Sequence, residues 1–424
     1  MSEWRDTTLG EFVGLQRGHD LTEPQRRIGH VPVMGSAGQN GFHDTALAKG
    51  PGIVVGRSGA SFGQVHFSPV DYWPHNTALY VTDFKSNDER FAFYFLKAID
   101  FSGYNSGSAQ PSLNRNFIYS IPVRIPPLAE QKAIAAVLGA LDDKIELNRR
   151  MNATLEAMAR ALFQSWFVDF DAVRAKLDGR PPAALDPATA ALFPEHFAHG
   201  EHDMLPVGWR LAAIEEVCGI NAWTLGKNDD LETLEYVEIS EVSRGNIANI
   251  ATYPRGEEPS RARRRLCHGD TVLSTVRPDR GSYFLALNPP ENRVASTGFA
   301  VLTPTKVPWS FLHAALTQPE ISDHLGQMAD GGAYPAVRPE IIGAMQVALS
   351  NEPKILEAFH RTCAPLFEQA EANRSQSRTL ATLRDTLLPK LLSGELSVAS
   401  LESATDAGKC SELPNSSNRR KPKP

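Results

Sequence analysis

The strongest constraint on this chain is an internal repeat. Residues 4–14 (WRDTTLGEFVG) share Trp-Arg and the spacing of an apolar residue, Glu and Gly with residues 209–219 (WRLAAIEEVCG), 205 positions later. Residues 107–113 (GSAQPSL) match residues 331–337 (GGAYPAV) at an offset of 224. Ordered matches along the chain predict one structural plan that is encoded twice. The larger second offset indicates insertions in the loops of the second copy.

Each copy predicts a mixed α/β domain. Residues 52–56 (GIVVG) and 270–274 (DTVLS) are short runs bounded by turn residues, which is typical of strands. Short helices are expected near residues 90–99 and 309–317. A chain of 424 residues is too long for one ordinary core, so two or more domains are expected. The predicted fold class is α/β (mixed α+β) with two repeated globular domains.

Each copy then ends in a long helix. From Ile134 to Trp166 the seam positions alternate at spacings of four and three, which is typical of a coiled coil. The same positions recur 225 residues later, from Phe359 to Leu391. A helix over 128–167 would be about 60 Å long. Because each helix leaves an apolar seam that needs cover, the two are expected to pack as an antiparallel coiled coil.

Polar residues interrupt both seams. Asn148 and Asn373 fall near the middles of the two helices, where a buried amide pair would fix the register of an antiparallel pair. The alternative is two separate helices with polar breaks. Arg384 is a clear break in the second seam, and Pro389 is expected to kink or stop that helix.

The segments between and after the copies differ in composition. Residues 178–206 are rich in Ala, Pro and Gly, which is typical of a linker, and the polar end is typical of disorder. The expected organisation is a first domain at 1–127, a helix at 128–177, a linker at 178–204, a second domain at 205–351, a helix at 352–396 and a disordered tail at 397–424.

Composition narrows the class of protein. The chain has 42% hydrophobic and 22% charged residues, and no apolar run long enough to span a membrane. Its start lacks the pattern of a secretory signal, and its four cysteines form no CxxC pair, so a cytoplasmic protein is expected. Because the formal net charge is −6, any contact with nucleic acid is expected to be confined to local positive patches or to be shared with a more basic partner.

Three patterns resemble catalytic or metal sites but favour plainer interpretations. Residues 288–291 (NPPE) resemble the NPP[Y/F] motif of adenine methyltransferases, but Glu291 replaces the stacking aromatic residue. Residues 56–63 (GRSGASFG) lack the Lys-Ser/Thr ending of a P-loop. The histidines at 196, 199 and 202 lie among Pro and Gly in a predicted loop. The sequence therefore predicts no catalytic residue, no metal site and no cofactor in this chain.

Polar and basic residues near glycines are candidates for DNA contact. Proteins recognise DNA through Arg, Lys, Asn, Gln and Ser or Thr side chains on loops and helix starts. The alternative is a solvated basic loop with ordinary turn residues. The candidates are Arg57, Ser58, Asn76, Ser108, Gln110, Asn114 and Arg115 in the first copy, and Arg261, Arg263, Arg264, Arg265, Arg277, Arg280, Tyr334 and Arg338 in the second.

Four longer motifs resemble those of type I restriction–modification DNA specificity subunits. Residues 125–134 (IPPLAEQKAI) are similar to the family's IPPLxEQxxI signature, and residues 141–167 to its central conserved helix. Residues 205–209 (LPVGW) resemble the entry to its second target-recognition domain, and residues 383–396 its closing conserved helix. The second copy departs from the pattern at residues 348–353, where PPLxEQ is missing.

The resemblance implies a non-catalytic subunit. In this family each recognition domain recognises one half of a bipartite double-stranded DNA target, and the helices set the spacer and dock two methylation subunits. Restriction subunits are further expected partners, and S-adenosylmethionine and ATP are expected on the partner subunits. The alternatives from other classes are a DNA methyltransferase or nuclease with duplicated recognition domains, and a coiled-coil adaptor without DNA contact.

Overall fold

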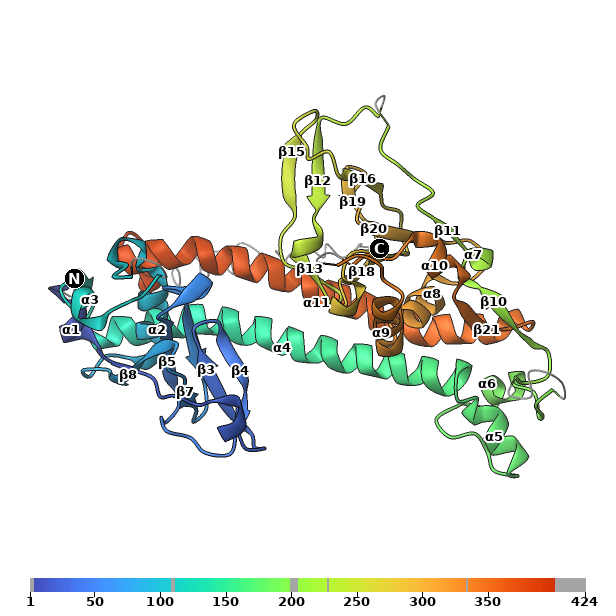
Figure 1. The fold of residues 1–424 in the computed structure, drawn as a ribbon, viewed down its shortest axis with the longest axis horizontal. Helices are drawn as coiled ribbons and strands as arrows, with labels where there is room; N and C mark the ends of the chain where they lie inside the picture. Colours follow the sequence, from blue (N-terminus) through green and yellow to red (C-terminus); the bar gives the residue numbers. More distant parts are fainter. Residues whose placement is uncertain (1–3, 108–110, 199–204, 227–228, 333–334, 401–424) are drawn as a thin grey trace, which may run out of the picture. The chain divides into compact units, whose positions relative to one another are not determined.

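The computed structural model describes residues 4–107, 111–198, 205–226, 229–332 and 335–400 (Figure 1). The chain forms two compact units. Unit 1 comprises residues 1–146 and 378–424, and unit 2 comprises residues 147–377. Two long helices, α4 (Leu128–Phe167) and α11 (Pro353–Ser393), each contribute residues to both units.

Unit 1 is built around an antiparallel sheet with a second, smaller sheet. Its other elements are β1 (Arg5–Thr8), α1 (Leu9–Phe12), β2 (Gly14–Arg17), η1 (Glu23–Gln25), β3 (Val31–Gly35), β4 (Gly38–His43), β5 (Gly52–Gly56), η2 (Gly59–Ser61), β6 (Val65–Ser68), β7 (Trp73–Pro74), β8 (Ala78–Asp83), α2 (Glu89–Ala98), η3 (Ser102–Tyr104), α3 (Arg115–Ile118) and β9 (Pro122–Ile125). The larger sheet has the order β2-β8-β5-β6, the smaller has the order β4-β3-β7, and β1 pairs with β9.

Unit 2 has a corresponding set of elements with additional strands. They are α5 (Asp171–Leu177), α6 (Pro187–Leu192), β10 (Trp209–Ala213), α7 (Ile214–Val217), β11 (Cys218–Ile220), β12 (Thr233–Val237), η4 (Ile239–Glu241), β13 (Val242–Ser243), β14 (Asn246–Ile247), β15 (Ala251–Pro254), β16 (Ala262–Arg265), β17 (Asp270–Ser274), η5 (Pro278–Arg280), β18 (Tyr283–Ala286), β19 (Arg293–Ser296), β20 (Phe299–Pro304), α8 (Trp309–Leu316), α9 (Pro319–Gln327), α10 (Pro339–Ala344) and β21 (Gln346–Ser350). The sheets are β11-β20-β17-β18 and β15-β12-β19-β16, with β10–β21 and β13–β14 pairs.

The predicted repeat is confirmed in the topology. The sheet β2-β8-β5-β6 of unit 1 matches β11-β20-β17-β18 of unit 2 strand for strand, and the pair β1–β9 matches β10–β21. The strands expected at 52–56 and 270–274 are β5 and β17, and both are buried throughout. The expected short helices are α2 and α8. Asp88 begins α2 by accepting a hydrogen bond from the Phe91 N–H at 2.8 Å.

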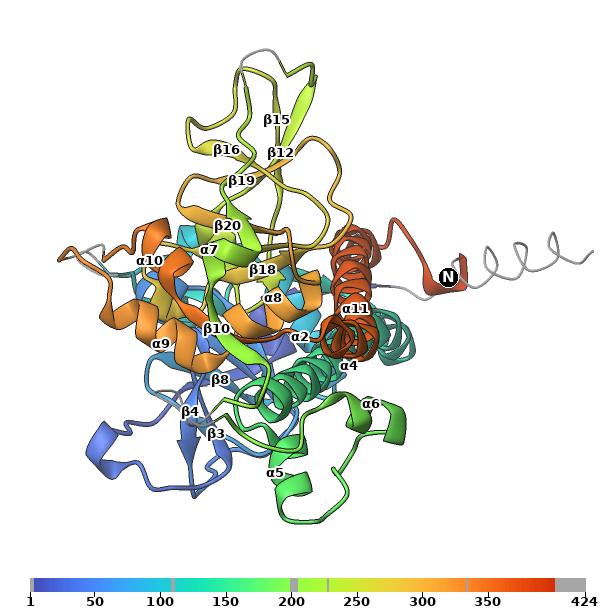
Figure 2. The same ribbon diagram turned by 90° about the vertical axis from the view of Figure 1, so that its right-hand side faces the viewer.

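The long helices α4 and α11 pack together, as the seam predicts (Figure 1 and Figure 2). In unit 1, Leu391 of α11 is fully buried in the same core as Ile134 and Leu138 of α4. In unit 2, the rings of Phe163 and Phe359 lie with their centroids 6.1 Å apart. Later residues of α4 meet earlier residues of α11, so the pair is antiparallel. Every helix in the described part of the chain is too short or too polar to cross a membrane.

Pro389 does not stop helix α11, which continues to Ser393 with Leu391 fully buried. The predicted linker contains the helix α6, which Asp186 caps. Phe193 then packs against Trp166 with centroids 5.3 Å apart, so this segment contributes to the core of unit 2. The predicted tail lies outside the described residues from 401 onward.

Candidate nucleic-acid interface

In unit 1, the loop that follows β5 is joined to the segment that precedes α3. The Arg57 carbonyl accepts a hydrogen bond from the Leu113 N–H at 2.7 Å, and Ser58 forms a bridge with Ser112. The Arg57 guanidinium donates to the Asn76 carbonyl at 3.2 Å. Three of the predicted residues therefore lie together. Ser108 and Gln110 lie outside the described residues.

Asn114 and Arg115 stand at the start of α3 beside the same loops. Asn114 caps the helix by accepting from the Asn116 N–H at 3.0 Å, and Arg115 donates to the Leu15 carbonyl at 3.0 Å. Both side chains are exposed. Arg115 and residues 16–20 line an open polar hollow of about 450 Å³. Asp20 in this hollow accepts a hydrogen bond from Asn76, and the Asn76 carbonyl accepts from Arg57, so these candidates are linked to the residues that line the hollow.

Unit 2 repeats the backbone contacts of this arrangement. The Thr275 carbonyl accepts from the Val337 N–H at 2.8 Å, and Val276 forms a bridge with Ala336. Thr275 and Val276 follow β17, as Arg57 and Ser58 follow β5. Ala336 and Val337 precede α10, as Ser112 and Leu113 precede α3. Arg338 stands immediately before α10 as Asn114 stands before α3, 224 positions earlier.

The other candidates of unit 2 fall into two groups. Arg277 has a left-handed backbone (φ 47°), and its N–H donates to the Pro335 carbonyl at 2.8 Å. Arg280 ends η5 and is exposed. The carbonyl of exposed Arg261 accepts from Thr297, and the next residue, Gly298, accepts from the Thr275 N–H at 2.9 Å. Arg261 is therefore linked to the repeated loop arrangement. Tyr334 lies outside the described residues.

The remaining arginines of the basic run do not form a loop. Arg263, Arg264 and Arg265 belong to β16, an edge strand of its sheet. Arg263 pairs with Glu258 at 3.3 Å, and Arg265 pairs with Asp229 at 3.6 Å and Glu291 at 3.4 Å. Burial lowers the pKa of Arg264. Much of the positive charge that the run presents in sequence is thus neutralised or partly buried.

An exposed tryptophan beside this strand was missing from the predicted set. Trp223 is 55% exposed although the backbone around it is held in place. Its carbonyl accepts from the Arg265 N–H at 3.1 Å, and the Leu225 N–H donates to the Arg263 carbonyl at 2.8 Å. By the 205-residue offset, Trp223 corresponds to Gly18 in the polar hollow of unit 1. Adding the 205-residue offset to the residues that line the hollow would have identified Trp223.

The patterns that resembled catalytic or metal sites have structural explanations. Asn288 adopts a left-handed turn (φ 46°) between β18 and β19, and Glu291 pairs with Arg265, so residues 288–291 form a turn. Within the described ranges no group of three or more His, Cys, Asp or Glu is placed to hold a metal ion. His196 is among those residues, whereas the histidines at 199 and 202 lie outside them.

The middles of the long helices meet in a buried polar layer inside unit 2. Asn148 is fully buried and donates to the Asn373 carbonyl at 3.2 Å and to Gln376 Oε1 at 2.9 Å. The Asn373 side chain donates to Asn152 Oδ1 at 2.9 Å. The side-chain amide pair is therefore Asn152–Asn373, not Asn148–Asn373 as expected, because Asn148 reaches the backbone of the facing helix.

Comparisons with known proteins agree with this architecture. Residues 1–157 match the family model described as "Type I restriction modification DNA specificity domain". The specificity subunit of the type I restriction enzyme HindI of Haemophilus influenzae is 25% identical over 68% of this chain and 71% of its own length. The MjaIX specificity subunit of Methanocaldococcus jannaschii is 21% identical over 73% and 70%.

A solved structure shows the same fold. The S subunit of a type I restriction–modification system from M. genitalium superposes with a TM-score of 0.55 at 16% identity, covering 92% of this chain and 96% of that one. The family model, the relatives and the duplicated topology agree. Residues 1–157 thus match the DNA specificity domain, and the chain as a whole is similar to type I restriction–modification specificity subunits. Such a subunit supplies the DNA specificity of a restriction–modification complex and is not itself an enzyme. S-adenosylmethionine and ATP are used by its partner subunits.

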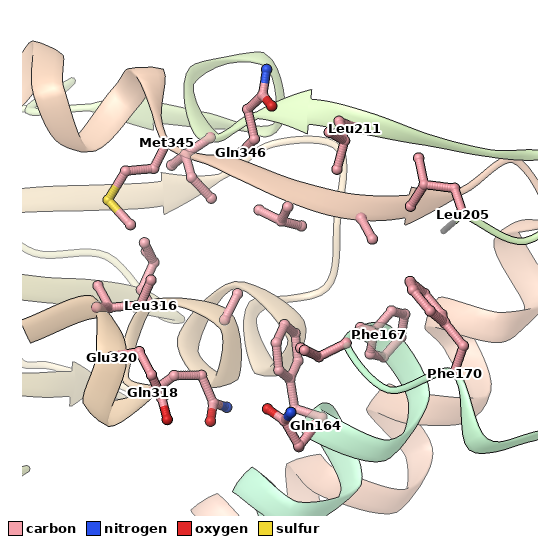
Figure 3. A pocket seen from close by; sticks show the side chains of 17 residues that line it. Gln164, Phe167, Phe170, Leu205, Leu211, Leu316, Gln318, Glu320, Met345 and Gln346 are labelled. Atoms are coloured by element: carbon pink, nitrogen blue, oxygen red, sulfur yellow. The ribbon is translucent and has the colours of Figure 1, made fainter. Parts of the chain in front are cut away.

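Unit 2 also has an apolar groove of about 750 Å³ (Figure 3). The end of α4 contributes Phe167, the β10–β21 pair contributes Leu211 and Met345 lies opposite Leu316 across the groove. Glu320 is the one charged residue among those that line it. A groove without basic side chains does not suit phosphate. The polar hollow of unit 1 and the equivalent loops of unit 2 are the better candidates for DNA contact.

Proposed function

We propose that the two globular domains, at residues 1–127 and 205–351, each recognise one half of a bipartite double-stranded DNA target. The helices at 128–177 and 352–396 then set the spacer between the half-sites, and residues 178–204 connect the two copies. The observation that supports this most strongly is the repeated loop arrangement. The Leu113–Arg57 bond of unit 1 has its counterpart in the Val337–Thr275 bond of unit 2.

The exposed side chains around these loops have the chemistry that DNA contact requires. Arg115, Arg280 and Arg338 present guanidinium groups that can bind phosphates or guanine edges, and Asn114 presents an amide that can pair with adenine. Arg57, Ser58 and Asn76 position the surface of unit 1 through their bonds with neighbouring segments. In unit 2, Trp223 offers an aromatic face on which a base can stack, an interaction worth about 1–3 kcal/mol.

The net charge of −6 bears on how this subunit binds DNA. Affinity for DNA comes largely from neutralising phosphates, and here Arg263 and Arg265 are already paired with carboxylates. We propose that partner subunits supply much of the positive field, so that tight binding belongs to the assembled complex.

The outer face of the helix pair suits docking of methylation subunits. Leu147, Met151 and Met158 are 46%, 37% and 49% exposed at spacings of four and seven on one side of α4. Leu383 of α11 is 45% exposed and lies 225 positions after Met158, at the equivalent place in the repeat. Exposed apolar residues in helical register mark partner surfaces. Two equivalent positions support two methylation subunits.

Domain exchange tests the proposed recognition. Residues 1–127 would be replaced by the corresponding domain of a relative with a different target, and the methylated motif of the assembled complex determined. The expected result is that one half of the motif changes while the other half and the spacer remain. The reciprocal exchange of residues 205–351 should change only the other half. If either exchange altered both halves, the division of labour would be wrong.

Charge substitution tests docking. Met158→Glu and Leu383→Glu should each reduce the assembly from two methylation subunits to one, as measured by mass determination in solution. Leu177→Glu is the matched control, because Leu177 is 51% exposed on α5 and away from the proposed docking face. Two bound methylation subunits in both single variants would contradict the proposed surface.

A further inference from the structure

A buried ion pair connects the two long helices inside unit 2. Arg374 of α11 bonds with Glu156 of α4, and their side chains are only 11% and 20% exposed. Arg160 lies 3.9 Å from Glu156, and Glu371 lies 3.4 Å from Arg374. Burial raises the pKa of Glu156, and the two arginines oppose that rise. Breaking such a pair is costly because it leaves one charge buried without its partner.

A turn of the recognition domain rests directly on this pair. Gly245, between β13 and β14, has a φ of +82°, and a Cβ built on it would lie 2.7 Å from the nearest guanidinium nitrogen of Arg374. Glycine favours that conformation, and a Cβ at this position would require the turn or the Arg374 guanidinium to shift. The position of the turn therefore depends on the position of the Arg374 side chain.

The same turn holds the segment that carries the candidate DNA contacts. The Gly245 N–H donates to the Tyr283 carbonyl at 2.7 Å, and the Arg244 N–H donates to the Gly281 carbonyl at 2.8 Å. Gly281 follows η5 as its C-cap, and the last residue of η5 is the exposed Arg280. Two hydrogen bonds thus connect the loop that carries Arg280, a candidate for DNA contact, with the turn that packs on the helix pair.

Aromatic side chains surround the pair. The rings of Tyr283 and His313 have centroids 6.2 Å apart, and His313 packs edge-on against Phe367 of α11 at 5.0 Å. The cavity enclosed by Glu156, Arg374 and these side chains is only about 10 Å³, so the pair is closely packed on this side.

We propose that the Arg374–Glu156 pair is a positioning element that fixes the η5 loop relative to the helices, and so sets which half-site spacings the subunit accepts. Arg374 does not contact DNA in this proposal, because its side chain is largely buried. Its effect passes through Gly245 to Gly281 and Arg280. The inference rests on the proposed function, in which the helices set the spacer.

Spacer discrimination in the assembled complex tests this inference. Methylation rates would be measured on duplexes with the cognate spacer and with one base pair added or removed, using Arg374→Met, Glu156→Gln and Gly245→Ala. The ratio of cognate to altered spacer should fall by about tenfold in each. Arg374→Lys, which keeps the charge beside Glu156, should recover part of the ratio. Glu368→Gln, on an exposed residue of α11, should behave as the wild type.

The outcomes separate the inference from its premise. An unchanged ratio in Arg374→Met with intact assembly would overturn the positioning role. If that variant failed to assemble, Gly245→Ala would decide, because it keeps both charges and only displaces the turn. A wild-type ratio in Gly245→Ala would then overturn it. If the wild-type complex itself showed no bipartite target, the proposed function would fail first.

Discussion

Removal of one heptad from each long helix should shorten the preferred spacer. Residues 144–150 of α4 and 375–381 of α11 are suitable, because they face each other in the antiparallel pair and their loss preserves the seam. The deletion keeps Asp142–Arg384 in unit 1 and the Asn152–Asn373 bond in unit 2. It removes Asn148 with its bonding partners Gln376 and Ser377, so no buried amide is left without its partner.

The expected magnitude follows from helix geometry. Seven residues account for about 10 Å of helix, and B-DNA rises about 3.4 Å per base pair, so the spacer should shorten by about three base pairs. A heptad rotates the helix by only about 20° against a full number of turns, whereas three base pairs rotate DNA by about 100°. Because DNA must absorb the difference by twisting, methylation should also slow.

The assay is long-read methylome sequencing of cells that express the deleted subunit with its methylation subunit. The half-sites should stay the same while the spacer shortens. The control deletes 144–150 alone, which places the Asn152–Asn373 layer out of register and should abolish assembly. A doubly deleted subunit that methylated the original motif with its original spacer would refute the idea that helix length sets the spacing.

Three further perturbations test the described contacts. Asn373→Leu should lower the free energy of unfolding by about 1–3 kcal/mol in urea titrations, because it leaves the buried Oδ1 of Asn152 without its donor, and an unchanged midpoint would contradict this. Trp223→Ala should slow methylation of the unaltered target, whereas Trp223→Phe should retain most activity. Equal methylation rates in the wild type and Trp223→Ala would exclude base stacking. Burial lowers the pKa of His313 to about 3, so the unfolded chain takes up the proton as pH falls below its ordinary value of about 6.5 and the folded chain loses stability. Relative to His313→Gln, the wild type should therefore lose about 2 kcal/mol between pH 7 and pH 5, and exposed His324→Gln should show no such difference.

Local patterns and the repeat predicted much of the fold. The strands β5 and β17 were identifiable because central strands buried on both faces are short apolar runs. The seam of α4 persists for ten positions and predicted a helix over 128–167, as observed, whereas residues 171–177 of the expected 128–177 segment form the separate helix α5. The repeat predicted that the two sheets share one topology, which comparison of β2-β8-β5-β6 with β11-β20-β17-β18 confirms.

Features that depend on contacts distant in sequence were not predictable. Arg384 appears as a break in the seam, yet it donates to Asp142 at 2.6 Å, 242 positions earlier, and Asp142 also accepts from Tyr94. The arginines of β16 resemble a solvated loop until the carboxylates that pair with them are placed. Pro389 predicts a helix end because proline lacks a backbone N–H, but the helix continues past it to the buried Leu391.

The sequence predicted individual residues and loops of the candidate DNA interface. Arg57 and Arg115 were predicted because they lie near a glycine or a helix start. In the structure Arg115 lines the polar hollow, and Asn76 donates to Asp20, which also lines it. Sequence alone gave no means to distinguish exposed Arg261 from ion-paired Arg263 two positions away, because the difference lies in Glu258 of a neighbouring turn. Which of these side chains contact bases stays a prediction.

The most direct test of bipartite recognition is methylome sequencing of a methylation-free host that expresses this chain with its methylation subunit. We expect adenine methylation at a split motif with two defined halves and a fixed spacer, and only when both chains are present. Methylation at a single continuous motif, or by this chain alone, would contradict the account of a duplicated, non-catalytic subunit that recognises two half-sites.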